Sequence, residues 1–170
     1  CNGGNDGTAT LTLSGGTGTL SANWGSANPN ALSAGTHLFT VSDSNNCLLT
    51  DSVTITQPAA ITASFITTDV DCYGDTTGAA TVLFSGGVTD YLLSWQNFTY
   101  LLPNGVNIFT TPVGVPAGIY PFGVTDANGC TYFDTITIFQ PAAITASSIV
   151  TQVSCNGGND GTATLTLSGG

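Results

Sequence analysis

The chain repeats itself, and the spacing of the repeats limits what it can fold into. Residues 1–16 recur unchanged at 155–170, and residues 57–64 recur unchanged at 140–147. A looser copy of the opening motif begins at Cys72. The sequence therefore predicts an array of similar units, with unit 1 at residues 1–57, unit 2 at 58–140 and the start of unit 3 at 141–170. In this division we expect the first strand of unit 1 to precede residue 1 and the parent protein to be longer.

Units 1 and 2 differ in length at one place. The stretch from Gly87 to Gly118 exceeds the matching stretch from Gly16 to Gly35 by 12 residues (31 − 19). The flanking motifs keep the same spacing in both units. We therefore expect an extended loop or an added hairpin around residues 97–114 of unit 2.

Apolar and polar residues alternate along most of each unit, a pattern with the period of a β-strand. Six or so short strands per unit predict an all-β protein made of tandem small antiparallel immunoglobulin-like β-sandwiches. Trp24 and Trp95 are the expected central aromatic residues. The expected core positions of unit 2 are Ala80, Val82, Phe84, Tyr91, Leu93, Trp95, Tyr120, Phe122, Val124, Tyr132, Ile136 and Ile138. Their counterparts in unit 1 are Ala9, Leu11, Leu13, Leu20, Ala22, Trp24, His37, Phe39, Val41, Leu49, Val53 and Ile55.

The charges exclude two classes of partner. The chain has no Lys or Arg and a formal net charge of −10. Phosphates therefore meet no cation, which argues against nucleic-acid binding and against attraction to anionic membranes. No apolar run reaches the roughly 20 residues of a membrane span, so we expect no membrane insertion in this segment.

Five cysteines predict an oxidising compartment and disulfide staples, because units of this size have small cores. Two pairings fit the spacing. Pairing within units gives Cys1–Cys47 and Cys72–Cys130 and leaves Cys155 for residues beyond the chain. Pairing across the Gln-Pro junctions gives Cys47–Cys72 and Cys130–Cys155 and leaves Cys1. We favour the pairing within units, and the alternative stays open.

The motifs of the repeat, taken together, resemble the SprB repeat. They are CNGG-x-DG, SGG, an aromatic residue four residues before a Trp (Tyr91 and Trp95), AG-x-Y, VTDANGC and a closing Gln-Pro. Unit 1 departs from the pattern with Leu20, with His37 in place of Tyr, and with DSNNC in place of DANGC. The resemblance implies a cell-surface adhesin or filament of the kind that gliding bacteria export by type IX secretion. By closer analogy, it implies the stalk of a grappling appendage used in predation.

Three kinds of modification or ligand site were considered. Ser52, Thr76 and Thr135 follow Asp in triplets that look like the O-glycosylation motif of this bacterial group. The Asp and Asn residues of NGGNDG (residues 2–7 and 156–161) and of the DANG and DSNN turns could ligate Ca²⁺. Turn chemistry alone explains them, so we expect no metal or other cofactor. His37 aligns with Tyr120 and reads as a structural residue.

The sequence predicts a structural or adhesive repeat segment of a long extracellular filament at the cell surface. We expect several chains to self-associate, with surface glycans or a prey or host surface as further partners. The alternative is a carbohydrate- or cell-surface-binding module that uses the extended loop 97–114, with Trp95, Phe98 and Tyr100 against the ligand. No arrangement of residues suggests catalysis, so we expect no enzyme.

Overall fold

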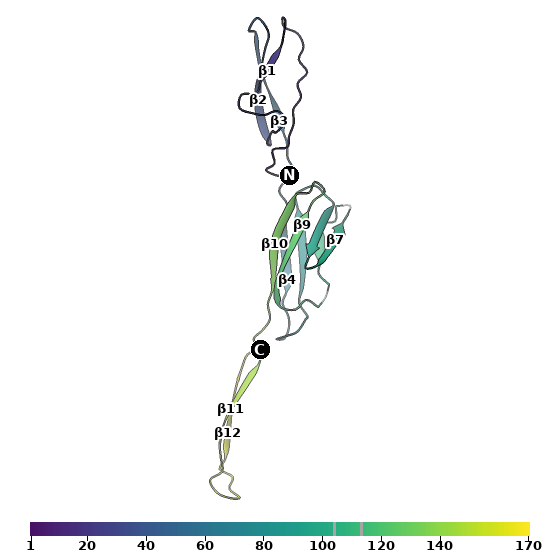
Figure 1. Cartoon of the computed structure of the whole chain (residues 1–170). Helices are drawn as coiled ribbons and strands as arrows, with labels where there is room; N and C mark the ends of the chain where they lie inside the picture. Colours follow the sequence, from purple (N-terminus) through teal and green to yellow (C-terminus); the bar gives the residue numbers. More distant parts are fainter. Residues whose placement is uncertain (104, 113) are drawn as a thin grey trace.

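The computed structural model describes residues 1–103, 105–112 and 114–170, and the described residues form twelve strands. These strands belong to three bodies arranged in a row, one for each repeat unit (Figure 1). Every strand pair is antiparallel, which confirms the predicted all-β class of tandem small sandwiches. Within the described residues, no helix is long and apolar enough to cross a membrane.

Unit 2 forms a sandwich of two sheets. One sheet has the order β4 (Thr62–Thr68), β5 (Ala79–Ser85), β8 (Ile108–Thr110). The other has the order β10 (Thr131–Ile138), β9 (Gly118–Thr125), β6 (Tyr91–Trp95), β7 (Phe98–Leu102). Alternate residues of each strand face the other sheet, because successive side chains of a strand point to opposite faces.

The core between these sheets is the one that the alternation predicts. The predicted residues of β5, β6, β9 and β10 are buried, except for Tyr120 and Tyr132, which are half-buried. Trp95 lies at the centre, with its ring centroid 5.4 Å from that of Tyr120 and 6.2 Å from that of Phe109. Burial of each large apolar side chain contributes about 1.5–3 kcal/mol.

The longer middle segment of unit 2 supplies two strands. β7 forms a hairpin with β6, and the chain then crosses to the other sheet, where β8 pairs with β5. Phe109 of β8 joins the core. Residues 97–114 therefore include a hairpin strand and a core strand. Asn104 and Val113, which fall within this predicted loop, lie outside the described residues.

Unit 1 contains a single sheet of β1 (Ser21–Asn23), β2 (Gly35–Ser42) and β3 (Leu48–Ile55). The predicted core positions Ala9, Leu11 and Leu13 imply a strand at residues 8–13, and this prediction is wrong, because the segment forms no β-ladder. Its equivalent in unit 2, β5, is held between β4 and β8. The described part of unit 1 has no counterpart of β4, and its short middle segment has no counterpart of β8.

The same difference changes the burial of unit 1. Trp24 is half-buried against Phe39, with ring centroids 5.0 Å apart, and is not the enclosed central aromatic that we expected. Ala22 and Leu49, both predicted core residues, are exposed. With only one sheet, there is no opposing layer to cover these positions.

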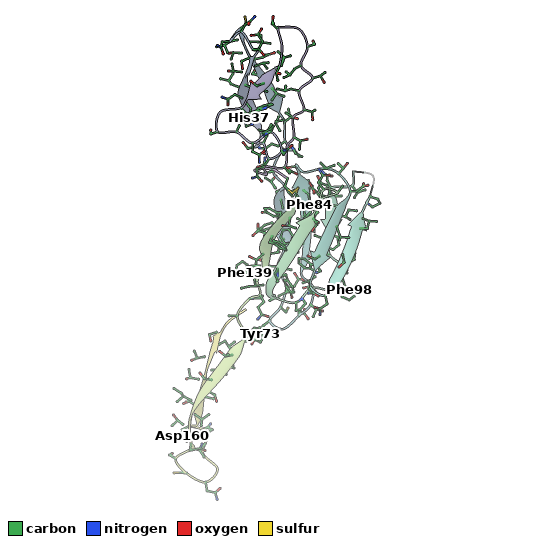
Figure 2. The ribbon with its side chains drawn as sticks, turned by 45° about the horizontal axis from the view of Figure 1, so that its top comes forward. His37, Tyr73, Phe84, Phe98, Phe139 and Asp160 are labelled. Atoms are coloured by element: carbon green, nitrogen blue, oxygen red, sulfur yellow. A yellow bond between two sulfur atoms is a disulfide. The ribbon has the colours of Figure 1, made fainter. Side chains whose placement is uncertain are left out.

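Unit 3 begins with a hairpin of β11 (Thr145–Thr151) and β12 (Thr162–Ser168). This pair is the equivalent of β4 and β5, and its side chains project into solvent along the lowest body of Figure 2. Leu165 is 62% exposed, whereas its equivalent in unit 2, Val82, is 0% exposed. The hairpin therefore exposes the apolar side chains that, in unit 2, pack against the second sheet of the sandwich.

Candidate functional site: the disulfide-linked junction between units

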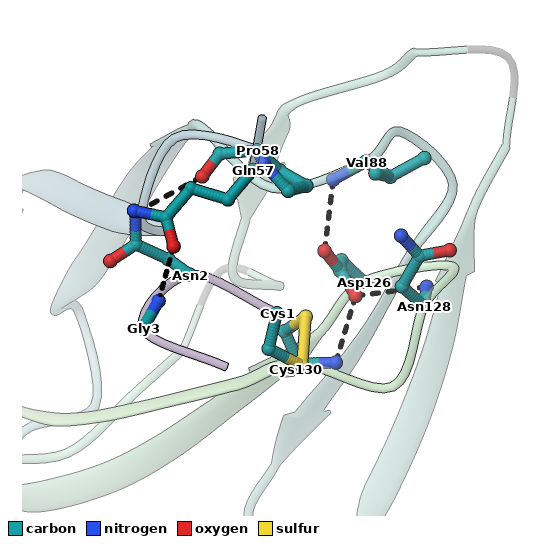
Figure 3. Close-up of a disulfide and its surroundings, with 9 residues drawn as sticks. All are labelled: Cys1, Asn2, Gly3, Gln57, Pro58, Val88, Asp126, Asn128 and Cys130. Carbon is teal, nitrogen blue, oxygen red and sulfur yellow. Dashed lines mark hydrogen bonds between the residues drawn. A yellow bond between two sulfur atoms is a disulfide. The ribbon is translucent and has the colours of Figure 1, made fainter. Parts of the chain in front are cut away.

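A disulfide between Cys1 and Cys130 joins unit 1 to unit 2 (Figure 3). The Cα atoms of the two residues are 5.3 Å apart, within the usual range for a disulfide. The predicted bonds Cys1–Cys47 and Cys72–Cys130 are wrong, and so are the alternatives Cys47–Cys72 and Cys130–Cys155. Cys47, Cys72 and Cys155 are exposed free thiols in this chain.

The strand lengths explain why the predicted pairs do not form. Cys47 precedes β3, and the opening loop at Cys1 lies beyond the other end of that strand, beside Gln57. Eight strand residues span about 26 Å at roughly 3.3 Å per residue. A disulfide requires Cα atoms within about 7 Å. The opening and turn cysteines of one unit therefore lie at opposite ends of that unit.

The opening loop of unit 1 is held on the Gln-Pro pair, where unit 1 ends at Gln57 and unit 2 begins at Pro58. The side-chain oxygen Oε1 of Gln57 accepts a hydrogen bond from the backbone N–H of Gly3 at 2.7 Å. The side-chain amide of Asn2 donates to the backbone carbonyl of Pro58 at 3.0 Å. These bonds place Cys1 at the end of unit 2 that carries the turn before Cys130 (Figure 3).

The turn that carries Cys130 is organised by the buried carboxylate of Asp126, which is 5% exposed. Its Oδ1 accepts hydrogen bonds from the backbone N–H groups of Asn128 at 2.9 Å and Cys130 at 2.8 Å. Its Oδ2 accepts a third, from Val88, at 2.9 Å. Burial acts to raise the pKa of Asp126, but these N–H groups outweigh it, so the pKa lies below its usual value.

A hollow of roughly 350 Å³ lies beside the disulfide. Its wall combines the two partners of the junction: the opening loop with the Pro58–Ile61 segment on one side, and the Asp126 turn on the other. Among the described residues, no three His, Cys, Asp or Glu side chains are grouped so that they could hold a metal ion. The chemistry that this site shows is a covalent bond between units.

The structure brings the three predicted aromatic ligand residues to one place, and their contact with a ligand stays a prediction. Trp95 is 3% exposed and packs mostly in the core. Phe98 is 62% exposed. It lies at the edge of unit 2 (Figure 2). Tyr100 is half-buried, with its ring 4.9 Å from that of Phe109. A hollow of roughly 200 Å³ is lined by Trp95, Phe98, Tyr100 and neighbouring residues.

The candidate glycosylation residues Ser52, Thr76 and Thr135 are all exposed. Ser52 and Thr135 occupy equivalent positions, on β3 and β10. In both places the preceding aspartate accepts a hydrogen bond from the backbone N–H of the hydroxyl residue, at 2.7 Å from Ser52 and 2.8 Å from Thr135. Modification of these hydroxyl groups stays a prediction.

His37 has the structural position that its alignment with Tyr120 predicts. The Nε2 atom of His37 lies 2.8 Å from the carbonyl oxygen of Ser33, four residues earlier. The hydroxyl of Tyr120 donates to the carbonyl of Pro116, also four residues earlier, at 2.7 Å. The imidazole thus replaces the phenol in the same contact.

Sequence reasoning missed the roles of Asp126 and Gln57. Both residues recur at equivalent positions of the repeat. Asp43 lies four residues before Cys47, as Asp126 lies four residues before Cys130, and Gln140 is the equivalent of Gln57. In the sequence they resemble ordinary turn and junction residues. Only the structure shows that they bring two different units together.

Comparison with known families agrees with the repeat. The model of the SprB repeat matches residues 1–21, 64–107 and 147–170, which together make up more than half of the chain. The three matches fall on units 1, 2 and 3 in turn. No curated protein and no solved structure gave a significant match to the chain.

Proposed function

Because this chain belongs to the SprB repeat family, we propose that it is a structural segment of the stalk of a long bacterial surface filament or adhesin. SprB repeats are typical of cell-surface proteins, and the chain is a repeat segment of a surface adhesin-like protein. In this proposal the segment sets the length and stiffness of the stalk and has no catalytic role. Export by type IX secretion and a part in gliding or predation belong to the same proposal.

The observation that carries the proposal is the covalent junction between units. A row of sandwiches joined only by flexible linkers would bend freely. Here the disulfide Cys1–Cys130 joins two units at a second place besides the main chain, and the hydrogen bond from Asn2 to Pro58 holds the opening loop of unit 1 on the start of unit 2. Such a junction suits a stalk that must transmit tension and keep its reach.

Electron microscopy of cells tests this proposal. Antibodies against unit 2 should label extracellular filaments on intact cells. Removal of one two-unit cassette from the gene should shorten the filaments in proportion to the residues removed. Labelling that requires cell lysis, or an unchanged filament length, would contradict the proposal.

Exposed aromatic residues favour a second candidate function, the binding of carbohydrate. Phe98 is exposed beside a hollow that Tyr100 also lines, and aromatic rings can stack on sugar rings. Phe98→Ala should then abolish binding of unit 2 to a glycan array without changing its unfolding midpoint. Phe133→Ala, at another exposed aromatic residue, is the matched control. Equal binding by both variants and the parent chain would remove this candidate.

Lateral self-association of several chains is part of the stalk proposal. β7 and β10 are the edge strands of the larger sheet, so their outer backbone groups could pair with another chain. Most of their side chains are uncharged, so neighbouring chains would repel each other little. Light scattering that shows a monodisperse monomer over a wide concentration range would count against this part.

A further inference from the structure

Each free cysteine of this chain occupies the position of a cysteine that is bonded at the junction of units 1 and 2. Cys72 and Cys155 are the equivalents of Cys1, and Cys47 is the equivalent of Cys130. We infer that every opening cysteine of the array forms a disulfide with the turn cysteine of the next unit. Cys72 then pairs with the turn of the unit that follows, and Cys47 pairs with the opening loop of the unit that precedes it. The inference concerns how units are joined and stands apart from the proposed adhesive role.

The loop around Cys72 is held as the loop around Cys1 is held. The backbone N–H of Gly74 donates to Oε1 of Gln140 at 2.9 Å, which reproduces the bond from Gly3 to Gln57 at 2.7 Å. Cys72 is therefore already fixed at the far end of unit 2, where unit 3 begins, as the loop at Tyr73 in Figure 2 shows.

The start of unit 3 is also shaped for the same junction. The backbone N–H of Gly170 donates to the carbonyl of Ala142 at 3.0 Å. In unit 2 the equivalent bond runs from Gly87 to Ala59 at 2.8 Å. The Pro-Ala-Ala segment and the SGG turn thus take the same arrangement in both units, although unit 3 is represented only by its first hairpin.

The hollow beside Cys72 is equivalent to the hollow at the junction of units 1 and 2, except that no turn with a bonded cysteine forms part of its wall. Its volume is roughly 340 Å³, against roughly 350 Å³ at the junction of units 1 and 2. It is lined by Asp71, Cys72, Tyr73, Pro141, Ala142, Ala143, Ile144 and Gly170. The bonded junction has equivalents of most of these residues and, in addition, Asp126, Gly129, Cys130 and Thr131. The missing wall is therefore the turn of an Asp-x-x-x-Cys segment.

Cys47 presents the other half of the junction. Asp43 accepts hydrogen bonds from the backbone N–H groups of Thr17 at 3.0 Å, Asn45 at 2.9 Å and Cys47 at 2.9 Å. These are the equivalents of the three bonds to Asp126. Asn46 has a φ of 62°, and its equivalent, the glycine of the second turn, has a φ of 79°. The turn is therefore built before any partner is present.

A hollow of roughly 360 Å³ lies beside Cys47 and Gly16. In unit 2 the position next to the equivalent glycine, Gly87, is filled by Ile61, whose Cγ1 lies 2.8 Å from where a Cβ on that glycine would stand. Ile61 belongs to the segment that follows the Gln-Pro pair. The hollow beside Cys47 thus matches the place that the Pro-Ala-Ala-Ile segment fills in unit 2, the segment beside which the opening loop of the neighbouring unit is held.

The bond requires an oxidant. Two thiols lose two protons and two electrons and form one S–S bond, while the disulfide of a thiol–disulfide oxidoreductase, or oxidised glutathione in vitro, is reduced to two thiols. An extracellular or periplasmic compartment provides such oxidants.

The pairing has a mechanical consequence. Cys130 and Cys155 are separated by 25 residues (155 − 130), which include β10, the Gln-Pro junction and β11. If both cysteines form disulfides to neighbouring units, a pulling force passes from unit to unit through the disulfides and this 25-residue segment. The rest of each unit then bears no load. A two-unit cassette of 154 residues (155 − 1) could then extend by only about 85 Å, against about 520 Å for the open chain at roughly 3.4 Å per residue. The maximum extension falls about sixfold.

An extended chain tests the inference. A second copy of residues 17–170 placed after Gly170 continues the repeat without a new sequence, because residues 155–170 are identical to 1–16. The chain is oxidised with a glutathione buffer and digested with a protease that cleaves before Asp. Every cysteine then falls in a separate peptide, since an aspartate lies between each pair of neighbouring cysteines. Because the two copies release identical cysteine peptides, the second copy is labelled with ¹⁵N by segmental ligation, so that its peptides differ in mass from those of the first. Mass spectrometry without reduction then identifies the bonded peptides and the copy from which each one comes.

The inference predicts three disulfides and three free thiols. Cys1 should be bonded to Cys130, Cys72 to the second copy of Cys47, and Cys155 to the second copy of Cys130. Cys47→Ser in the first copy is the matched control and should remove one free thiol and leave all three disulfides. A bond between Cys72 and either Cys130 or the first Cys47, or a single free thiol in the oxidised chain, would overturn the inference.

Force spectroscopy gives an independent measurement on the same chain. The oxidised protein should extend much less before rupture than the reduced protein, approaching the sixfold ratio as the array is lengthened. Equal extension of the two forms would overturn the inference.

Discussion

The carboxylate of Asp126 holds the backbone N–H of Cys130 at 2.8 Å, and this bond sets the geometry of the cysteine that joins units 1 and 2. The same carboxylate binds two more N–H groups and is almost completely buried. A buried charge is tolerated only where hydrogen bonds replace its hydration. Asp126 is therefore both a stabilising group of unit 2 and the residue that positions the junction.

We predict that Asp126→Asn destabilises unit 2 by about 1–3 kcal/mol, the usual loss when a charged acceptor is removed from buried donors. Both oxygens of the carboxylate accept hydrogen bonds from backbone N–H groups, so the NH₂ group of the new amide must face at least one N–H donor and loses that hydrogen bond. Urea unfolding followed by tryptophan fluorescence measures the change. Asp71→Asn, at an exposed aspartate of the same unit, should stay within about 0.5 kcal/mol of the parent. Equal effects of the two substitutions would contradict this role.

The lowered pKa of Asp126 predicts an acid-sensitive unit. The unfolded-state pKa of an aspartate is about 3.9, and the folded value is lower. The stabilisation is therefore fully present above about pH 5 and is lost as the pH falls through 4 toward the folded pKa. The unfolding free energy of the parent should fall over this range, and that of Asp126→Asn should fall less steeply. Parallel curves would show that another carboxylate dominates.

Strands and core of unit 2 could be predicted from the sequence because alternation of apolar residues reports burial directly. The same pattern misled at residues 8–13, where Leu11 and Leu13 have the right spacing but no neighbouring strand. A strand needs a partner for its backbone groups, and the partner of this segment is not specified by the segment itself. Local pattern therefore predicted the strands that have neighbours within the chain.

The disulfide pairing could not be predicted because spacing along the chain does not tell which ends of two sandwiches meet. Cys1 is nearer in sequence to Cys47 than to Cys130, yet β3 keeps the first pair apart. The direction of the strands decides the pairing. Cys47 and the Cys1 loop lie at opposite ends of β3, and this separation is what excludes the pairing within units.

Two glycines of unit 2 should respond differently to alanine. A Cβ at Gly78 would lie 2.6 Å from the carbonyl oxygen of Val115 and 2.7 Å from Ile138, both fixed parts of the core. A Cβ at Gly123 would lie 2.7 Å from the ring of the exposed Phe133 and 2.8 Å from the hydroxyl of Ser94, which are side-chain atoms and not backbone. Gly78→Ala should cost about 1–3 kcal/mol in the unfolding free energy, and Gly123→Ala clearly less. The reverse order would contradict the packing described here.

The hydroxyl of Tyr120 should contribute about 0.5–1.5 kcal/mol through its bond to the carbonyl of Pro116. Tyr120→Phe removes this bond and keeps the ring against Trp95. Denaturant unfolding measures the loss. His37→Phe, which removes the equivalent contact in unit 1, is the matched variant. If Tyr120→Phe leaves the unfolding free energy unchanged, the contact contributes nothing to stability.

Loss of the disulfide should loosen the junction and leave unit 2 folded. The core of unit 2 consists of its own residues, so Cys1→Ser removes a link between units and no core contact. Small-angle scattering should show a wider distribution of shapes for Cys1→Ser than for the parent. The unfolding midpoint of unit 2, followed by the fluorescence of the buried Trp95, should stay nearly the same. Cys155→Ser, at a thiol that is free in this chain, should change neither measurement. A large loss of unit 2 stability in Cys1→Ser would show instead that the disulfide holds the sandwich itself together.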